Sequence, residues 1–221
     1  MNVIDLRVLP KTVQQITVEK LRGAILSGMF KPGERLLEAQ LCEMLGVSRP
    51  SVREALRSLE AERLVTLVPN KGPHIPIVTW EQATEIYQVR ALLESEAAAL
   101  AAGRASASDI KKMRAALAAF RKAARNGDAA AQVESTADFY AELLRLCGNS
   151  IIEETLSGLL ARINFLRAKS MSRPGRAEYS FKEMAAILDA VEAGDSEAAR
   201  RAAANHVEQA HTSAREAYRH E

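Results

Sequence analysis

Apolar and polar residues recur with a helical period in three short stretches near the start of the chain, which predicts three helices. These stretches cover residues 13–28, 36–45 and 48–63. Turn residues separate them at 31–33 and at Gly46. In the third stretch, the apolar positions that would face the other two helices are Val52, Ala55, Leu56 and Leu59.

After the third stretch the pattern changes to one that is typical of β-strands. Residues 64–68 are rich in β-prone side chains, residues 74–78 alternate, and a Pro-Asn-Lys-Gly turn separates them at 69–72. This arrangement predicts a short β-hairpin. Because proline cannot donate a ladder hydrogen bond, Pro76 would limit the second strand to an edge position.

From Thr79 onward the helical period returns and persists. Thr79 is a favourable N-cap for the helix that follows it. Breaks rich in Gly, Pro, Asn and Ser divide the remainder into six predicted helices, at 80–103, 107–126, 129–147, 150–169, 178–193 and 196–219. The predicted fold is therefore mostly α, with an N-terminal domain of helices and a short hairpin at 1–78 and an all-α six-helix bundle at 79–221.

Composition and charge agree with this division. Of the 221 residues 48% are hydrophobic and only 5% aromatic, and Ala is abundant, which favours close-packed helices over sheets. Residues 1–78 contain 11 Lys and Arg against 8 Asp and Glu, whereas residues 79–221 contain 19 against 20. Any contact with nucleic acid is therefore expected in the N-terminal part.

Three features favour a cytoplasmic protein. Cys42 and Cys147 are too few and too far apart to suggest a disulfide framework, so we expect thiols in a reducing compartment. No apolar stretch approaches the roughly 20 residues of a membrane span, so no membrane partner is expected. The N-terminus also lacks the basic-then-apolar pattern of an export signal.

The segment GVSRPSVREALR, which begins at Gly46, carries the clearest functional pattern. Gly46 permits the positive φ of a tight turn, and Ser48 can cap the helix that follows. That helix presents Arg49, Arg53 and Arg57 at spacings of four. Such a cationic edge suits the phosphates and base acceptors of a DNA major groove, and the spacing is that of a helix-turn-helix with the hairpin as its wing. The alternative is an ordinary helical corner with exposed arginines.

Two groups of motifs resemble known regulator families across nearly the whole chain. The first resembles the winged helix-turn-helix domain of GntR-type transcription regulators and comprises Pro32-Gly33-x-Arg35-Leu36, residues 46–56, and residues 64–72. The second resembles the helical effector domain, called FCD, of the FadR/VanR branch and comprises Arg90-x-x-Leu93-Glu94-x-x-Ala97, residues 139–149, and residues 187–195. Six helices rather than seven resemble the VanR-like form. The resemblance implies a sequence-specific DNA-binding transcription regulator, expected to be a repressor, that a small organic acid controls.

The resemblance assigns seven residues to DNA binding, namely Arg35, Ser48, Arg49, Ser51, Arg53, Lys71 and Gly72. It implies that Arg49 and Arg53 face the major groove, where guanine O6 and N7 are the natural bidentate target. Lys71 at the wing tip would approach the minor groove, and Arg57 would either touch the DNA backbone or be solvated. The family usually has Gly where Arg63 stands, so Arg63 is expected to adopt a left-handed backbone conformation.

Many relatives bind a divalent metal through four ligands in the helical domain. The resemblance places those ligands at Thr136, Tyr140, Met184 and His206. Thr, Tyr and Met are poor substitutes for such ligands. The nearby carboxylates of Asp138, Glu142 and Glu183 would not replace them without a shift in helical register. The sequence therefore predicts no metal and no cofactor.

Tyr140, Met184 and His206 predict an effector pocket that suits a partly apolar carboxylate better than a citrate-like polyanion. The resemblance gives Arg90 the role of holding the carboxylate, which suits a planar bidentate donor. Alternatively Arg90 forms only an i,i+4 pair with Glu94, and His206 is only a hydrogen-bonded core residue. Arg162 and Arg167 on the fourth of the six predicted helices are weaker candidates. The predicted effector-binding residues are Arg90, Thr136, Tyr140, Arg162, Met184 and His206.

The expected partners are a double-stranded DNA operator, the effector and a second copy of the chain. A homodimer would match a pseudo-palindromic operator, because two-fold protein symmetry requires two half-sites. One rival is a DNA-binding regulator that has lost effector control. An enzyme is not expected, because neither a Ser–His–acid arrangement nor a phosphate-cradling Gly-rich loop can be identified.

Overall fold

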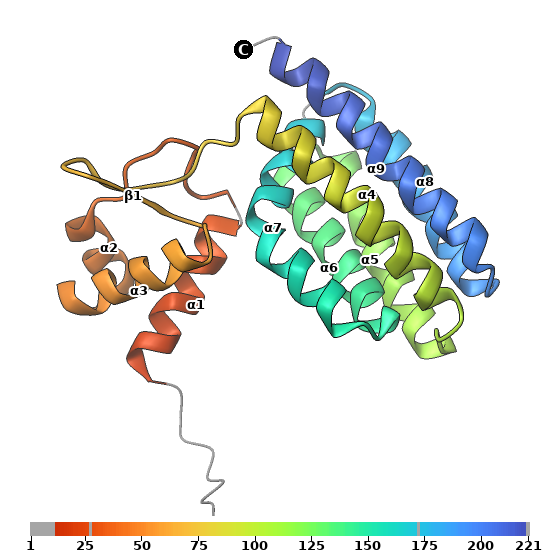
Figure 1. Cartoon of the computed structure of the whole chain (residues 1–221), viewed down its shortest axis with the longest axis horizontal. Helices are drawn as coiled ribbons and strands as arrows, with labels where there is room; N and C mark the ends of the chain where they lie inside the picture. Colours follow the sequence, from red (N-terminus) through yellow and green to blue (C-terminus); the bar gives the residue numbers. More distant parts are fainter. Residues whose placement is uncertain (1–11, 27, 172, 220–221) are drawn as a thin grey trace, which may run out of the picture. The chain divides into compact units, whose positions relative to one another are not determined.

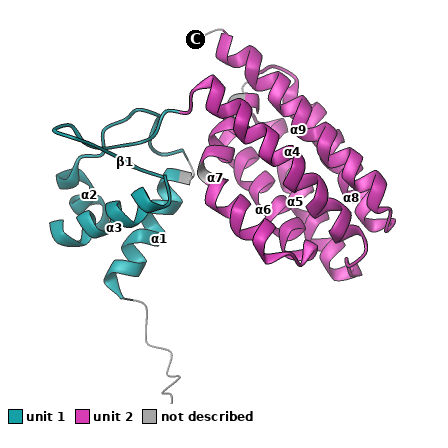
Figure 2. Cartoon of the chain, in the orientation of Figure 1, with its two compact units in different colours: residues 1–77 teal, residues 78–221 magenta. Residues whose placement is uncertain are grey.

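The computed structural model describes residues 12–26, 28–171 and 173–219. The chain divides into two compact units, which we call the N-terminal unit, residues 1–77, and the helical unit, residues 78–221 (Figure 2). None of the described helices is both long and apolar enough to cross a membrane.

The described part of the N-terminal unit contains three helices and a small hairpin (Figure 1). Its elements are α1 (Val13–Leu26), α2 (Glu38–Leu45), α3 (Arg49–Ala61), β1 (Thr66–Val68) and β2 (Gly72–His74). The predicted inward face of α3 is buried, as are Leu21 of α1 and Leu41 of α2, and α3 contacts both of those helices. The order and type of these elements confirm the predicted winged helix-turn-helix.

The second strand of the hairpin was predicted at the wrong residues. It occupies Gly72–His74 instead of 74–78, with Val68 opposite Gly72 and Thr66 opposite His74. The backbone beyond His74 turns to another partner, because Ile75 exchanges hydrogen bonds with Gly33 and Glu34 rather than with β1. Pro76 therefore lies outside the strand and does not determine its position in the sheet.

Two residues next to α3 have left-handed backbone conformations. Gly46 ends α2 with a φ of 67°, and its N–H donates to the Cys42 carbonyl. Arg63 has a φ of 58°, which confirms the conformation expected at this position. Only glycine adopts this region without a steric penalty from its Cβ atom, so Gly46 is needed for the turn.

Replacing Gly46 with Ala should lower the free energy of unfolding of the N-terminal unit by about 1–2 kcal/mol. The reason is backbone strain alone, since an added Cβ would meet no atom within 4 Å. Gly23→Ala is the matched control, because Gly23 is helical and its added Cβ also has open space. The control should be neutral or stabilising. Urea denaturation followed by circular dichroism measures both variants, and equal effects would contradict the role of the turn.

The helical unit confirms the predicted six-helix bundle within the described residues. Its helices are α4 (Trp80–Ala102), α5 (Ala107–Asn126), α6 (Ala129–Cys147), α7 (Ser150–Met171), α8 (Arg176–Glu192) and α9 (Ser196–Arg219). Thr79 caps α4 as predicted. Its hydroxyl accepts a hydrogen bond from the Gln82 backbone N–H at 3.3 Å, and the Gln82 side-chain oxygen accepts one from the Thr79 backbone N–H. Helix α8 begins two residues before the predicted start, directly after Gly175, whose φ is 78°.

Small residues let α4 and α9 lie side by side along the bundle (Figure 1). Ala97, Ala98 and Ala101 of α4 are fully buried, as are Ala199 and Ala203 of α9. The abundance of Ala thus has a structural reason, since short side chains allow close helix contacts. At the start of α4, the Trp80 ring stacks on His211 of α9 with centroids 5.0 Å apart and planes at 8°.

Candidate functional site

The helix-turn-helix presents a polar, cationic side to solvent. The Ser48 hydroxyl accepts the backbone N–H of Ser51 at 3.5 Å, and the two hydroxyl oxygens lie 3.0 Å apart. Because the opposite side of α3 is buried in the N-terminal unit, its arginines project outward. The arginines of α3 are Arg49, Arg53 and Arg57, and all three are exposed.

Two of these arginines are paired with carboxylates. Arg53 Nε donates to both oxygens of Glu38, at 2.9 and 3.0 Å, and Arg57 donates to Glu54 at 3.0 Å. The Arg53 and Arg57 side chains are 61% and 70% exposed. Exposed pairs of this kind stabilise a protein by about 0–1 kcal/mol, so either guanidinium can exchange its partner for a phosphate or a base.

The structure brings Arg35 together with the tip of the hairpin. Arg35 forms an antiparallel bridge with His74, and a Cβ on Gly72 would lie 3.9 Å from the Arg35 guanidinium nitrogens. Gly72 has a φ of 85°, which favours glycine, and Lys71 beside it is exposed. These residues form one basic surface although Arg35 is far from the others in sequence.

A second group of arginines is buried inside the helical unit. Arg90 and Glu94 form an ion pair on α4, with Arg90 Nε 2.7 Å and Nη2 3.4 Å from the two carboxylate oxygens. Their side chains are 0% and 2% exposed. Arg167 of α7 is also buried, donates to Asn164 Oδ1 at 2.9 Å and lies over the Tyr140 ring, with its Cζ 4.8 Å from the centroid.

This cluster contains two buried guanidiniums but one carboxylate. Burial and then the like charge of Arg90 lower the pKa of Arg167 to about 10, so Arg167 remains protonated at neutral pH. Burial raises the pKa of Glu94, but Arg90 outweighs that effect and the pKa lies below its ordinary value. Arg90 Nη1 and Arg167 Nε have no hydrogen-bond partner among the described residues. The three side chains therefore leave one positive charge and open donors, an arrangement suited to an anion.

A small cavity adjoins this cluster. Its volume is about 80 Å³, and its polar wall consists of Glu94, Tyr140, Ser157 and Arg167. The apolar wall comes from α6 and α7, through Ala137, Ala141, Leu144, Leu156, Leu160 and Ile163. Burial raises the pKa of Tyr140 well above its ordinary value, so its hydroxyl stays neutral. A guanidinium with an unpaired donor, that of Arg167, therefore lies beside a small apolar space.

His206 is buried and contacts the carboxylate of Glu183. Its Nδ1 lies 2.8 Å from Glu183 Oε2, and Arg176 donates to both Glu183 oxygens at 2.8 and 2.7 Å. Glu183, which the sequence analysis considered only as a possible metal ligand, is therefore the hydrogen-bond partner of His206. Met184, which the resemblance placed there, is fully buried and contacts Ser180 through its sulfur at 3.9 Å. Burial lowers the pKa of His206, although Glu183 opposes the shift.

The remaining predicted pocket residues take different positions. Tyr140 lines the cavity, and its ring centroid lies 6.0 Å from that of His206. Thr136 donates its hydroxyl to the Gln132 carbonyl of its own helix at 2.7 Å. Arg162 is half-buried on α7, and the residues that line the cavity do not include it.

Arg167 is the cavity arginine on α7, although the sequence had suggested it only as a weaker candidate. It lies four residues after buried Ile163, so its place on an apolar stripe was a usable signal. The described residues contain no group of three or more His, Cys, Asp or Glu side chains that could hold a metal ion.

Comparison with known proteins gives matches for both units. Residues 13–75 match the family described as bacterial regulatory proteins, gntR family, and residues 85–209 match the FCD domain. The chain is 31% identical to the uncharacterized HTH-type transcriptional regulator YdhC of Bacillus subtilis over 82% of this chain and 81% of that protein. It is 29% identical to the galactonate operon transcriptional repressor of Escherichia coli over 81% of this chain and 86% of that protein.

The fold has also been observed before. The solved structure of Escherichia coli McbR/YncC superposes with a TM-score of 0.84 at 25% identity, covering 95% of this chain and 100% of that chain. The named relatives are transcriptional regulators and not enzymes. From its two matched segments and the relatives that share them, this chain belongs to the GntR family of bacterial DNA-binding transcription regulators, in the group that carries an FCD domain.

Proposed function

We propose that the N-terminal unit reads an operator through two surfaces. The first is the outer edge of α3, where Arg49 and Arg53 would meet guanines in the major groove while Ser48 and Ser51 contact phosphates or base edges. The exposure of Ser48, Arg49 and Arg53 supports this assignment, and Ser51 is half-buried. The second is the hairpin tip, where Arg35, Lys71 and Gly72 would lie along the backbone and minor groove.

We infer that the helical unit binds a small carboxylate between Arg90 and Arg167. The observation that carries this inference is that the cluster holds two buried guanidiniums and one carboxylate, that of Glu94, which is paired with Arg90. A buried charge without a partner is costly, so an anion that completes the cluster would be favoured strongly over water. The open donors on both arginines suit the two oxygens of a carboxylate.

The charge and the cavity also restrict the class of acid. One excess positive charge favours a monocarboxylate, because a second carboxylate would be buried without a partner. The adjoining cavity of about 80 Å³ is smaller than the roughly 150 Å³ in which benzene binds an engineered site, so the apolar tail should contain few carbons.

We further propose that residues 79–221 dimerise and that the acid relieves repression at a pseudo-palindromic operator. The name of the related galactonate operon repressor supports repression of transcription rather than activation. For the acid to act, it must bind more tightly to the dimer that holds DNA poorly than to the dimer that holds it well.

A thermal-shift screen of short monocarboxylates, dicarboxylates and polyanions tests this function. At about 100 times its dissociation constant, a binding acid should raise the melting temperature of a chain this size by about 5–10 °C. Arg167→Met should abolish the response, whereas Arg201→Met, at an exposed position on α9, should retain it. An active acid should also weaken operator binding in a gel-shift assay.

The alternative is a regulator without effector control, and the small size of the cavity favours it. If no acid stabilises the wild type, or if Arg167→Met responds as the wild type does, the effector proposal fails. DNA binding that is unchanged by every acid would then support constitutive regulation.

A further inference from the structure

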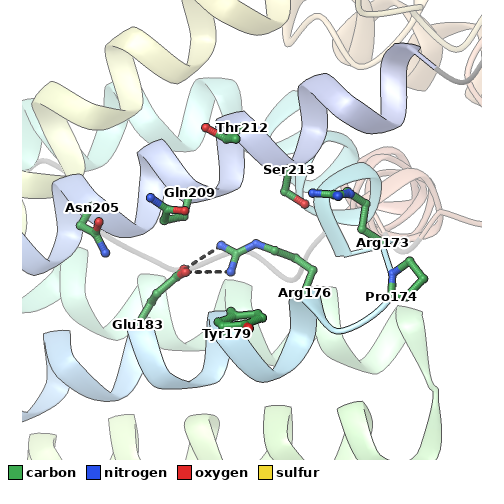
Figure 3. A pocket seen from close by; sticks show the side chains of 9 residues that line it. All are labelled: Arg173, Pro174, Arg176, Tyr179, Glu183, Asn205, Gln209, Thr212 and Ser213. Atoms are coloured by element: carbon green, nitrogen blue, oxygen red, sulfur yellow. Dashed lines mark hydrogen bonds and ion pairs between the residues drawn. The ribbon is translucent and has the colours of Figure 1, made fainter.

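An open groove runs between α8 and α9 on the helical unit (Figure 3). Its volume is about 460 Å³, within the roughly 300–1,000 Å³ of typical small-molecule sites. Tyr179 and Glu183 line one side, and Asn205, Gln209 and Thr212 line the other, with Arg176 at the start of α8. The groove is separate from the cavity at Arg167, because the two have no lining residue in common.

Each charged side chain that lines this groove already has an ion-pair partner. Arg176 donates two hydrogen bonds to the Glu183 carboxylate, and His206 Nδ1 provides a third contact to it at 2.8 Å. At the end of the groove, Arg173 is paired with Glu216. A charged ligand would have to displace one of these partners, so the groove has no charge that selects an anion or a cation.

Three neutral polar side chains of the groove, in contrast, are open, whereas the Ser213 hydroxyl donates to the Ser170 carbonyl. No side-chain hydrogen bond joins Asn205, Gln209 or Thr212 to any other residue of the described chain. Amides and hydroxyls both donate and accept, which matches the bonding of hydroxyl groups. A further donor belongs to the buried Arg176, whose Nε has no partner within the described ranges.

Tyr179 adds a flat apolar surface beside these groups. Its side chain projects at the groove edge (Figure 3) and is 64% exposed. Lys182 Nζ lies over one face of this ring, 5.8 Å from its centroid. The other face can cover the C–H face of a saturated ring while the amides bind the hydroxyls at its rim. The combination differs from the cationic, apolar surroundings of the buried arginines.

We propose that this groove is a second ligand site, which binds a neutral, polyhydroxylated ring such as a monosaccharide or a cyclic polyol. The ring lies on Tyr179, and its hydroxyls exchange hydrogen bonds with Asn205, Gln209 and Thr212. The Arg176–Glu183 pair forms the floor and stays intact. This site does not depend on the carboxylate effector proposed for the interior.

Saturation-transfer NMR and calorimetry on the full chain test the proposal, with glucose and myo-inositol as neutral probes and acetate as the anionic comparison. Both neutral probes should bind to the wild type. Gln209→Leu should weaken their binding about tenfold, as expected for the loss of hydrogen bonds to one side chain. Gln88→Leu is the matched control, because Gln88 is exposed on α4 and does not line the groove. It should bind as the wild type does.

Two further variants separate this site from the interior one. Tyr179→Ser alters an exposed side chain and should also weaken the neutral probes, whereas Arg167→Met should leave their binding unchanged. The proposal is overturned if neither neutral probe binds, if Gln209→Leu binds them as the wild type does, or if Arg167→Met abolishes their binding. A response to acetate that Arg167→Met removes would concern the interior site alone.

Discussion

Replacing Glu94 with Gln is expected to lower the free energy of unfolding of the helical unit by about 3–5 kcal/mol. The change removes the only carboxylate of the cluster, which is paired with Arg90, and leaves the two guanidiniums of Arg90 and Arg167 buried. Arg167→Met should have the opposite sign and raise stability by about 1–3 kcal/mol, because it removes a buried cation without a carboxylate of its own. Chemical denaturation followed by circular dichroism measures both.

The control for this pair of variants is Glu192→Gln. Glu192 contacts Arg114 at 2.7 Å, but both side chains are about half exposed, at 48% and 56%. Its loss should change stability by less than about 1 kcal/mol. If Glu94→Gln changes the free energy of unfolding as little as the control does, water must reach the buried guanidiniums. A stabilised Arg167→Met protein that no longer responds to acids would show that the chain gives up stability for ligand binding.

Arg53→Ala should weaken operator binding by about 1–3 kcal/mol, which corresponds to a factor of about 5–150. We expect the loss to be confined to one base position, because a guanidinium that reads guanine carries sequence information. Arg57→Ala on the same helix is the matched control. It should weaken binding to operator and to random DNA alike. It should also lower the salt dependence of the affinity by the amount expected for about one phosphate contact.

The measurement is fluorescence anisotropy at several salt concentrations, on an operator selected from a random DNA pool. Equal losses on operator and random DNA would remove Arg53 from base recognition. The Arg53–Glu38 pair adds a second readout. If the guanidinium leaves Glu38 for DNA, then Glu38→Gln should change operator affinity less than Arg53→Ala does.

The helices were predictable because local signals agree with the packing. The apolar period and the caps at Ser48 and Thr79 act within a few residues, and the structure contains these elements close to the predicted ends. The second strand was misplaced because its boundary depends on the backbone of residues 33–36, which pairs with residues 73–75. Local alternation contains no information about that partner.

The interior site was less predictable, for a reason of geometry. One residue along a helix turns the side chain by about 100°, so a choice between Glu183 and Met184 depends on how α8 is rotated against α9. The sequence does not determine that rotation by periodicity alone. The same limit applies to Arg167, whose burial follows from the packing of α7 and not from its own polarity.

Trp80 gives this molecule an internal optical reporter. It is the one tryptophan among 221 residues, so its emission has a single source. Because its ring stacks on His211, the fluorescence reports directly on whether the beginning of α4 and the later part of α9 are still in contact. Loosening of that helix pair, by heat, denaturant or a bound ligand, can therefore be followed in the unmodified protein without an attached dye.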